Sequence, residues 1–138
     1  MQLGHNTKTD LIKRVPLFAS ASKAELAEIA SIADEIDLPA GKSLITEGDA
    51  GREFFVLIEG NADVVRGGKH VAKLGPGDFF GEIALIAKTP RNATITTTTA
   101  VRALVITDRA FRHLLDHSPE IAVGVLVALA ERLAPTTL

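Results

Sequence analysis

The sequence predicts an α+β fold: a small antiparallel, jelly-roll-like β-barrel with an N-terminal helix, one short inserted helix and C-terminal helices. Between residues 36 and 106, short runs of β-branched and aromatic residues are separated by Gly, Pro, Asn and Asp every eight to twelve residues. On both sides of this region, apolar residues recur at helical spacing. Helix, antiparallel strands and then helices is an order typical of α+β domains.

The N-terminal part is expected to be helical. Ser22 and Glu25 form a capping-box pattern, which predicts a helix over about 22–34. Before it, residues 11–18 predict a short helical turn that is stopped by Pro16.

The middle of the chain is expected to form the barrel. Gly67 and Gly68 predict a two-residue hairpin turn, because such turns need positive φ angles that glycine adopts freely. The run from Thr96 to Thr99 predicts a half-exposed strand. The expected strands are residues 43–46, 54–58, 62–66, 70–74, 93–98 and 103–106.

The C-terminal part, about 108–134, predicts two helices. Asp108 is a good N-cap for a helix over 109–116, and after a break at Ser118 and Pro119 a second helix continues to about residue 133. This second helix is apolar all round: one face carries Ile121, Val125, Leu129 and Leu133, and the others carry Val123, Leu126, Val127 and Ala130. We expect a homodimer through this helix, with Gly124 permitting close approach; burial by the segment 11–32 is the alternative.

Composition and charge exclude several classes of function. The chain has 138 residues and a net charge of −2, which predicts one soluble domain over 1–138 and disfavours nucleic acid as a partner. The absence of Cys excludes a disulfide framework, a cysteine nucleophile and Cys-based metal sites. The polar N-terminus shows no signal peptide, and the longest uncharged apolar stretch has ten residues, half of a membrane span. We therefore expect a cytoplasmic protein.

The segment 75–94 interrupts the strand pattern with a glycine-rich loop and an expected single-turn helix over about 82–87. The N-terminus of that helix suits an anion, and Gly81 lets the anion approach the backbone. Arg91 is placed to hold a phosphate with its planar fork. Glu82 beside the same anion suits a hydrogen bond from a sugar hydroxyl. Together these residues indicate a nucleotide monophosphate.

The stretch Phe80-Gly81-Glu82-Ile83-Ala84-Leu85, followed by Pro90-Arg91-Asn92-Ala93-Thr94, resembles the phosphate-binding cassette of the cyclic nucleotide-binding domain family. That family includes the catabolite activator protein and the regulatory subunit of protein kinase A, and the resemblance covers about residues 10–134. It implies that Glu82 binds the ribose 2′-hydroxyl and Arg91 the cyclic phosphate. It further implies that the amides of Ile83, Ala84 and Asn92 bind the other phosphate oxygens, and that Val64, Val71 and Leu74 line the purine side.

Two departures from the family pattern refine this expectation. Asn92 stands where a Thr is associated with cGMP, which favours cAMP as the ligand and leaves cGMP as the second candidate. We also expect the protein to lack the helix-turn-helix DNA reader of the catabolite activator family, and to lack kinase-inhibitory and channel segments. The sequence thus predicts a stand-alone cAMP sensor or regulatory module without catalytic activity, cofactor or metal, acting on an unidentified effector protein.

Other interpretations stay open. The chain could be a regulatory fragment of a larger effector or transcription regulator, a ligand-blind interaction domain, or a cupin-like metal enzyme. His113 and His117 have zinc-compatible spacing, but no third ligand lies between them, and a solvated helix face explains them better. Only His70 falls in an expected strand, which disfavours a cupin-like site.

Overall fold

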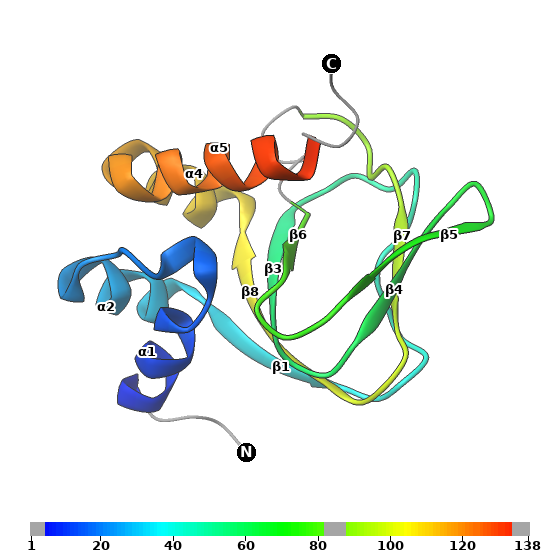
Figure 1. The fold of residues 1–138 in the computed structure, drawn as a ribbon, viewed down its shortest axis with the longest axis horizontal. Coiled ribbons are helices and arrows are strands. Elements are labelled where there is room, and N and C mark those ends of the chain that lie inside the picture. The colour runs from blue at the N-terminus through cyan, green and yellow to red at the C-terminus, as the bar shows by residue number, and fades with distance from the viewer. Residues whose placement is uncertain (1–4, 82–87, 134–138) are drawn as a thin grey trace. The chain divides into compact units, whose positions relative to one another are not determined.

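Helices and strands of this chain segregate into two compact units (Figure 1). Among the described residues, a helical unit combines 5–32 with 109–133, and a sheet unit comprises 33–81 and 88–108. The computed structural model describes residues 5–81 and 88–133. The expected short helix at 82–87 therefore lies outside the described residues. None of the described helices combines the length and apolar character needed to cross a membrane.

The helical unit begins with two helices joined by a 3-10 turn. The capping box that starts the second of them is confirmed: the Ser22 amide donates to Glu25 Oε1 at 2.9 Å, and the Glu25 amide donates to Ser22 Oγ at 3.1 Å. This helix ends at Ile32, two residues earlier than expected, because Asp34 already belongs to a strand. The elements are α1 (His5–Lys13), η1 (Pro16–Phe18) and α2 (Lys23–Ile32).

The C-terminal elements of this unit are α4 (Asp108–His117) and α5 (Pro119–Leu133), as expected. Ser118, between them, is 3% exposed, and its hydroxyl donates to Glu25 Oε2. This hydrogen bond, with a second one from the Ser22 amide, lowers the pKa of Glu25 below its ordinary value. Glu25 thus joins the start of α2 to the α4–α5 junction.

Helix α5 is covered on one side only within its unit. Ile121 and Val125 are buried, and α5 contacts η1. A Cβ added at Gly124 would lie 3.2 Å from the Leu17 carbonyl oxygen, so the close approach at Gly124 is to η1 of the same chain. The sequence-based prediction places the backbone of a partner chain at Gly124 instead. Three further α5 side chains are at least half exposed: Val123 (56%), Leu126 (65%) and Val127 (50%).

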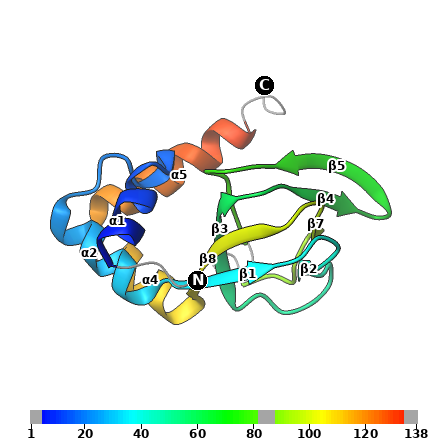
Figure 2. The ribbon, with the colours of Figure 1, turned by 90° about the horizontal axis from the view of Figure 1, so that it is seen from below.

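The sheet unit contains two four-stranded antiparallel sheets, shown from a second side in Figure 2. One sheet has the order β1-β8-β3-β6, with β1 (Asp34–Leu38), β8 (Val101–Thr107), β3 (Glu53–Glu59) and β6 (Phe79–Phe80). The other has the order β2-β7-β4-β5, with β2 (Ser43–Ile45), β7 (Thr94–Thr97), β4 (Ala62–Arg66) and β5 (Lys69–Leu74). The antiparallel strands with flanking helices are confirmed, but the strand pairs given by the described residues form two sheets and no closed barrel.

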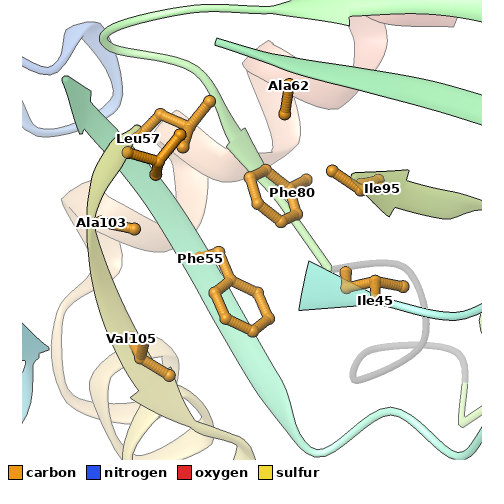
Figure 3. Packing of buried hydrophobic residues seen from close by; sticks show 9 residues of the cluster. Ile45, Phe55, Leu57, Ala62, Phe80, Ile95, Ala103 and Val105 are labelled. Carbon is orange, nitrogen blue, oxygen red and sulfur yellow. The ribbon is translucent and has the colours of Figure 1, made fainter. Parts of the chain in front are cut away.

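The core of the sheet unit lies between these two sheets (Figure 3). Phe55 of β3 and Phe80 of β6 stack with ring centroids 5.1 Å apart and an interplanar angle of 11°. From the other sheet, Ile45, Ala62 and Ile95 complete the same cluster. Apolar side chains of both sheets are thereby removed from water, which is the main force that holds the unit together.

Three features of the sheets differ from the sequence-based expectation. Strand β1 is polar and half exposed, and its place is fixed by pairing with β8. Strand β6 has two residues inside the glycine-rich segment and is defined by its pairing with β3. Thr97 was expected on a half-exposed strand but is 2% exposed, because its hydroxyl donates to the Pro39 carbonyl and accepts from the Lys42 amide.

The Gly67-Gly68 hairpin turn is confirmed, with φ angles of 58° and 77°.

Candidate functional site

The glycine-rich turn before the candidate site is fixed onto β3. The Gly77 amide donates to the Leu57 carbonyl, and the Leu57 amide donates to the Asp78 carbonyl, each at 2.8 Å. The Asp78 carboxylate also accepts a hydrogen bond from the Gly75 amide at 2.8 Å. These contacts lead the chain into β6 and hold Gly81 at the end of that strand.

Arg91 is anchored through its backbone to the loop that follows β2. Its amide donates to the Asp49 carbonyl at 2.8 Å, and its carbonyl accepts from the Gly48 amide at 2.9 Å. Arg91 is 7% exposed, so its position is fixed by contacts within the sheet unit. A buried arginine held by its own backbone is a pre-organised cation.

The Arg91 side chain points at two backbone carbonyls. Its Nη1 donates to the Gly81 carbonyl at 2.8 Å, and its Nη2 donates to the Glu53 carbonyl at 2.7 Å. Both nitrogens of the fork are therefore oriented, which suits two-point recognition of a planar or tetrahedral anion. The structure thus brings together Gly81 and Arg91, two of the residues that the sequence predicted to share a site.

Gly81 is required by this arrangement for a reason that the sequence did not show. Its φ of +95° is strained for any residue with a side chain. A Cβ at this position would also lie 2.7 Å from the Glu53 carbonyl oxygen and 3.0 Å from Arg91 Nη1. The structure shows that the missing side chain makes room for Arg91, whereas access of an anion to this backbone stays a prediction.

A second set of contacts surrounds the residues that follow Arg91. The Nε of Arg66, at the end of β4, donates to the Asn92 carbonyl at 2.9 Å. The Glu47 amide donates to Thr94 Oγ1 at 2.9 Å, and Glu47 Oε1 accepts from the Gly67 amide at 3.0 Å. The β4–β5 turn and the loop after β2 are thereby joined to the segment 91–94.

The residues expected on the purine side do not share one environment. Val64 and Leu74 are half-buried and pack against the core between the sheets. Val71 is 51% exposed and falls at a register shift, where Val64 pairs with Ala72 and Val65 pairs with His70. Val64 and Leu74 thus sit at the rim of the core, whereas Val71 lies on the surface of the β4–β5 hairpin.

The remaining predicted site residues divide into buried, exposed and undescribed positions. Phe80 belongs to the core, and Ala93 is 4% exposed. Asn92 is exposed, with its carbonyl bound by Arg66. Glu82, Ile83 and Ala84 lie outside the described residues, so their roles stay predictions.

Histidines do not assemble a metal centre in the described part of the chain, where no group of three His, Cys, Asp or Glu is placed to hold an ion. The rings of His113 and His117 stack with centroids 4.1 Å apart, and His113 Nε2 is 3.6 Å from Glu28 Oε1. His70 lies on β5, 3.3 Å from an Asp63 carboxylate oxygen.

A hollow of about 340 Å³ lies elsewhere in the sheet unit, lined by residues that include Leu38, Pro39 and Ala100. Its one arginine, Arg102, is 3.0 Å from Asp37, and this hydrogen bond raises the pKa of the guanidinium. None of the lining residues is a predicted site residue, so the hollow supports no nucleotide assignment.

Sequence reasoning missed several residues that shape the site. Glu53, Asp49 and Gly48 act through backbone groups, which any residue type can supply. Arg66 and Glu47 act through side chains, and an arginine at the end of a strand next to a Gly-Gly turn was the available signal for the first of them.

Comparison with known proteins gives one matching family model, the cyclic nucleotide-binding domain, over residues 35–118. A cAMP-dependent protein kinase regulatory subunit of Mycosarcoma maydis is 37% identical over 132 residues, which are 89% of this chain and 24% of that protein. A cyclic nucleotide-gated potassium channel of Rhizobium etli is 37% identical over 122 residues, 88% of this chain and 34% of the channel. A solved structure titled "cAMP bound PfPKA-R (141-441)" aligns with a TM-score of 0.84 and 27% identity, covering 95% of this chain and 45% of that one.

Proposed function

This chain belongs to the cyclic nucleotide-binding domain family, and from that premise we propose that it binds cAMP as a regulatory module without catalytic activity of its own. The observation that carries the proposal is the buried fork of Arg91, held by the Gly81 and Glu53 carbonyls inside a matching phosphate-binding segment. In this proposal Arg91 binds the cyclic phosphate. The amides of Ile83, Ala84 and Asn92 bind the remaining phosphate oxygens.

Glu82 accepts a hydrogen bond from the ribose 2′-hydroxyl in the proposed complex, and Val64, Val71 and Leu74 contact the purine. The half-buried positions of Val64 and Leu74 support an apolar surface there. Asn92 in place of a threonine favours cAMP over cGMP. Phe80 and Ala93 support the site from the core.

The identity of the effector protein is not determined by these comparisons. The chain spans 24% of the matched kinase regulatory subunit and 34% of the matched potassium channel. One of those proteins is a protein kinase regulatory subunit and the other is a potassium channel. We therefore propose that this domain regulates an attached or bound effector protein through a conformational change. We propose the cytoplasm as its location. A homodimer through α5 is a further part of the proposal, supported by the exposed Val123, Leu126 and Val127.

Calorimetric titration with cAMP, cGMP and AMP tests the proposal. The wild-type chain should bind cAMP most tightly, and Arg91→Ala should lose about 2–5 kcal/mol of binding free energy, because the buried phosphate charge loses its main partner. Arg102→Ala is the matched control: it removes an arginine of β8 that pairs with Asp37 of β1, and it should bind as the wild type does. Equal cAMP affinity of Arg91→Ala and wild type, with a native circular dichroism spectrum, would contradict the site assignment.

A further inference from the structure

Arg66 lies on the face of β4 that points toward the core between the sheets. Strand β4 pairs regularly with β7, Ala62 opposite Thr97 and Val64 opposite Ile95. Ala62 belongs to the core cluster, and Val64 packs against it. Alternate residues of a strand share a face, so Arg66 is the next residue of that face, at the exposed end of the strand.

The Arg66 side chain is fixed beside the segment that carries Arg91. Its Nε donates to the Asn92 carbonyl at 2.9 Å. This hydrogen bond uses one of the five N–H donors of the guanidinium. Among the described residues, no acceptor is given for its two terminal nitrogens. A charged donor group is thus held one residue away from the arginine of the proposed phosphate site.

The carboxylate of Glu47 contacts the residue that follows Arg66, and it accepts a backbone hydrogen bond there. Glu47 Oε1 accepts from the Gly67 amide at 3.0 Å, and the structure gives no ion pair between Glu47 and Arg66 within the described ranges. In the part of the chain that the structure describes, Glu47 of the loop after β2 is therefore no ion-pair partner of Arg66.

We propose that Arg66 is a second cationic residue of the nucleotide pocket and a determinant of its specificity, favouring ligands that carry negative charge beside Asn92. The inference rests on the proposed function, because it takes the bound nucleotide to lie along Val64, Arg91 and Asn92. The Nε bond to Asn92 orients the guanidinium, and the terminal nitrogens supply charge and donors to the cyclic phosphate. A neutral nucleoside gains little from such a group, whereas a cyclic monophosphate gains both a charge interaction and hydrogen bonds.

Two replacements separate the charge of Arg66 from its structural contact. Arg66→Gln removes the charge and keeps an N–H donor that can reach toward Asn92, and Arg66→Lys keeps the charge. Lys73→Gln is the matched control: it removes one charge from the same hairpin, where Lys73 pairs with Asp63, a residue out of phase with Ala62 and Val64.

Calorimetric titration of the wild type, these variants and Arg91→Ala with cAMP, at low and high salt, tests the proposal. We expect Arg66→Gln to bind cAMP about 3- to 10-fold more weakly, with a shallower salt dependence, since the group is partly solvated and its contribution is screened. Arg66→Lys and Lys73→Gln should stay within about twofold of the wild type.

Each contrary result has a distinct meaning. If wild type binds cAMP and Arg91→Ala does not, but Arg66→Gln matches wild type, the role of Arg66 is wrong and the proposed function stands. Equal losses in Arg66→Gln and Arg66→Lys with an unchanged salt dependence would show a purely structural tie to Asn92 and would also overturn the proposal. If the wild type binds no cyclic nucleotide, the proposed function fails, and this inference fails with it.

Discussion

Glycines 48, 60 and 81 have nearly the same φ angles, +90°, +89° and +95°, but differ in what surrounds the missing side chain. At Gly48 nothing lies within 4 Å of an added Cβ. At Gly60 the Ala100 carbonyl oxygen would be 2.2 Å away, and at Gly81 the Glu53 carbonyl oxygen would be 2.7 Å away. The backbone conformation therefore accounts for all three glycines, and close packing adds a second requirement at Gly60 and Gly81.

Gly60→Ala should destabilise the protein more than Gly48→Ala. Both substitutions place a side chain at positive φ, which costs about 1–2 kcal/mol. Only Gly60→Ala also forces a Cβ against the backbone of Ala100, which adds about 1–3 kcal/mol. Urea unfolding of the two variants measures the difference, and equal free energies of unfolding would show that the packing around Gly60 relaxes without cost.

Glu82→Gln tests the second proposed ligand contact. Because the proposed partner of Glu82 is the uncharged ribose hydroxyl, the substitution should weaken cAMP binding by about 1–3 kcal/mol. The affinity for 2′-deoxy-cAMP should change far less, since that ligand lacks the hydroxyl. Titration of both proteins with both ligands completes the cycle, and equal losses for the two ligands would mean that Glu82 does not contact the ribose.

At the scale of elements, hydrogen bonds between distant segments decide how helices and strands join. Within the helical unit, Glu25 accepts from the Ser22 amide at the start of α2 and from the Ser118 hydroxyl at the α4–α5 junction. Within the sheet unit, Thr97 of β7 is joined to Pro39 and Lys42 in the turn before β2. Glu25 binds groups of two segments, whereas Thr97 binds two backbone groups of one turn and joins that turn to β7.

Glu25→Gln should reduce stability at neutral pH by about 1 kcal/mol, because two hydrogen bonds to a charged acceptor become weaker. The pKa of Glu25 is lowered in the folded protein, mainly by the Ser118 hydroxyl and then by the Ser22 amide. Its stabilising contribution is therefore fully present above the unfolded-state pKa, near 4.5, and is lost as the pH falls through the lower folded-state pKa.

Thermal unfolding of wild type and Glu25→Gln between pH 7 and pH 3 measures this dependence. The stability difference between the two proteins should shrink below about pH 4.5. Glu120→Gln, at the start of α5, is the control for removal of a carboxylate from the helical unit. A difference that stays constant over this pH range would contradict a role of the ionised Glu25.

At the scale of the whole molecule, the exposed apolar side chains of α5 are the feature that bears on assembly. Ile121 and Val125 are buried, whereas Val123, Leu126 and Val127 are at least half exposed. An extended apolar surface of this kind often marks an interface between proteins. The contact of Gly124 with Leu17 supplies cover for one side of the helix and leaves the other side for a partner.

Sedimentation equilibrium with and without cAMP tests the proposed homodimer. Val123→Lys and Val127→Lys should each shift the equilibrium to monomer without abolishing nucleotide binding, because a charge on the apolar face must be desolvated in the dimer. Ala40→Lys, exposed in the turn between β1 and β2, is the control for an added charge. We expect cAMP to shift the dimerisation free energy by about 1–3 kcal/mol. A wild-type monomer at high micromolar concentration in both conditions would contradict the dimer.

The sequence by itself determined the features that depend on neighbouring residues. The Ser22–Glu25 capping box and the Gly67-Gly68 turn arise from local hydrogen bonds and local backbone preferences, so their patterns are visible in short stretches. The start of α4 at Asp108 was visible from the residue type alone. The strand pattern of residues 36–106 likewise predicted the antiparallel sheets. The cassette around Gly81 and Arg91 pointed to the cyclic nucleotide-binding family that the comparisons establish.

Only the tertiary structure decided the features that join distant segments. The Arg91 fork binds the Glu53 carbonyl, 38 positions away along the chain, and Arg66 binds the Asn92 carbonyl, 26 positions away. Strand β6 exists because it pairs with β3, and Thr97 is buried because Pro39 and Lys42 satisfy its hydroxyl. Every residue type carries the same backbone acceptors, so the identity of these partners is absent from any local pattern and is set by the folded chain.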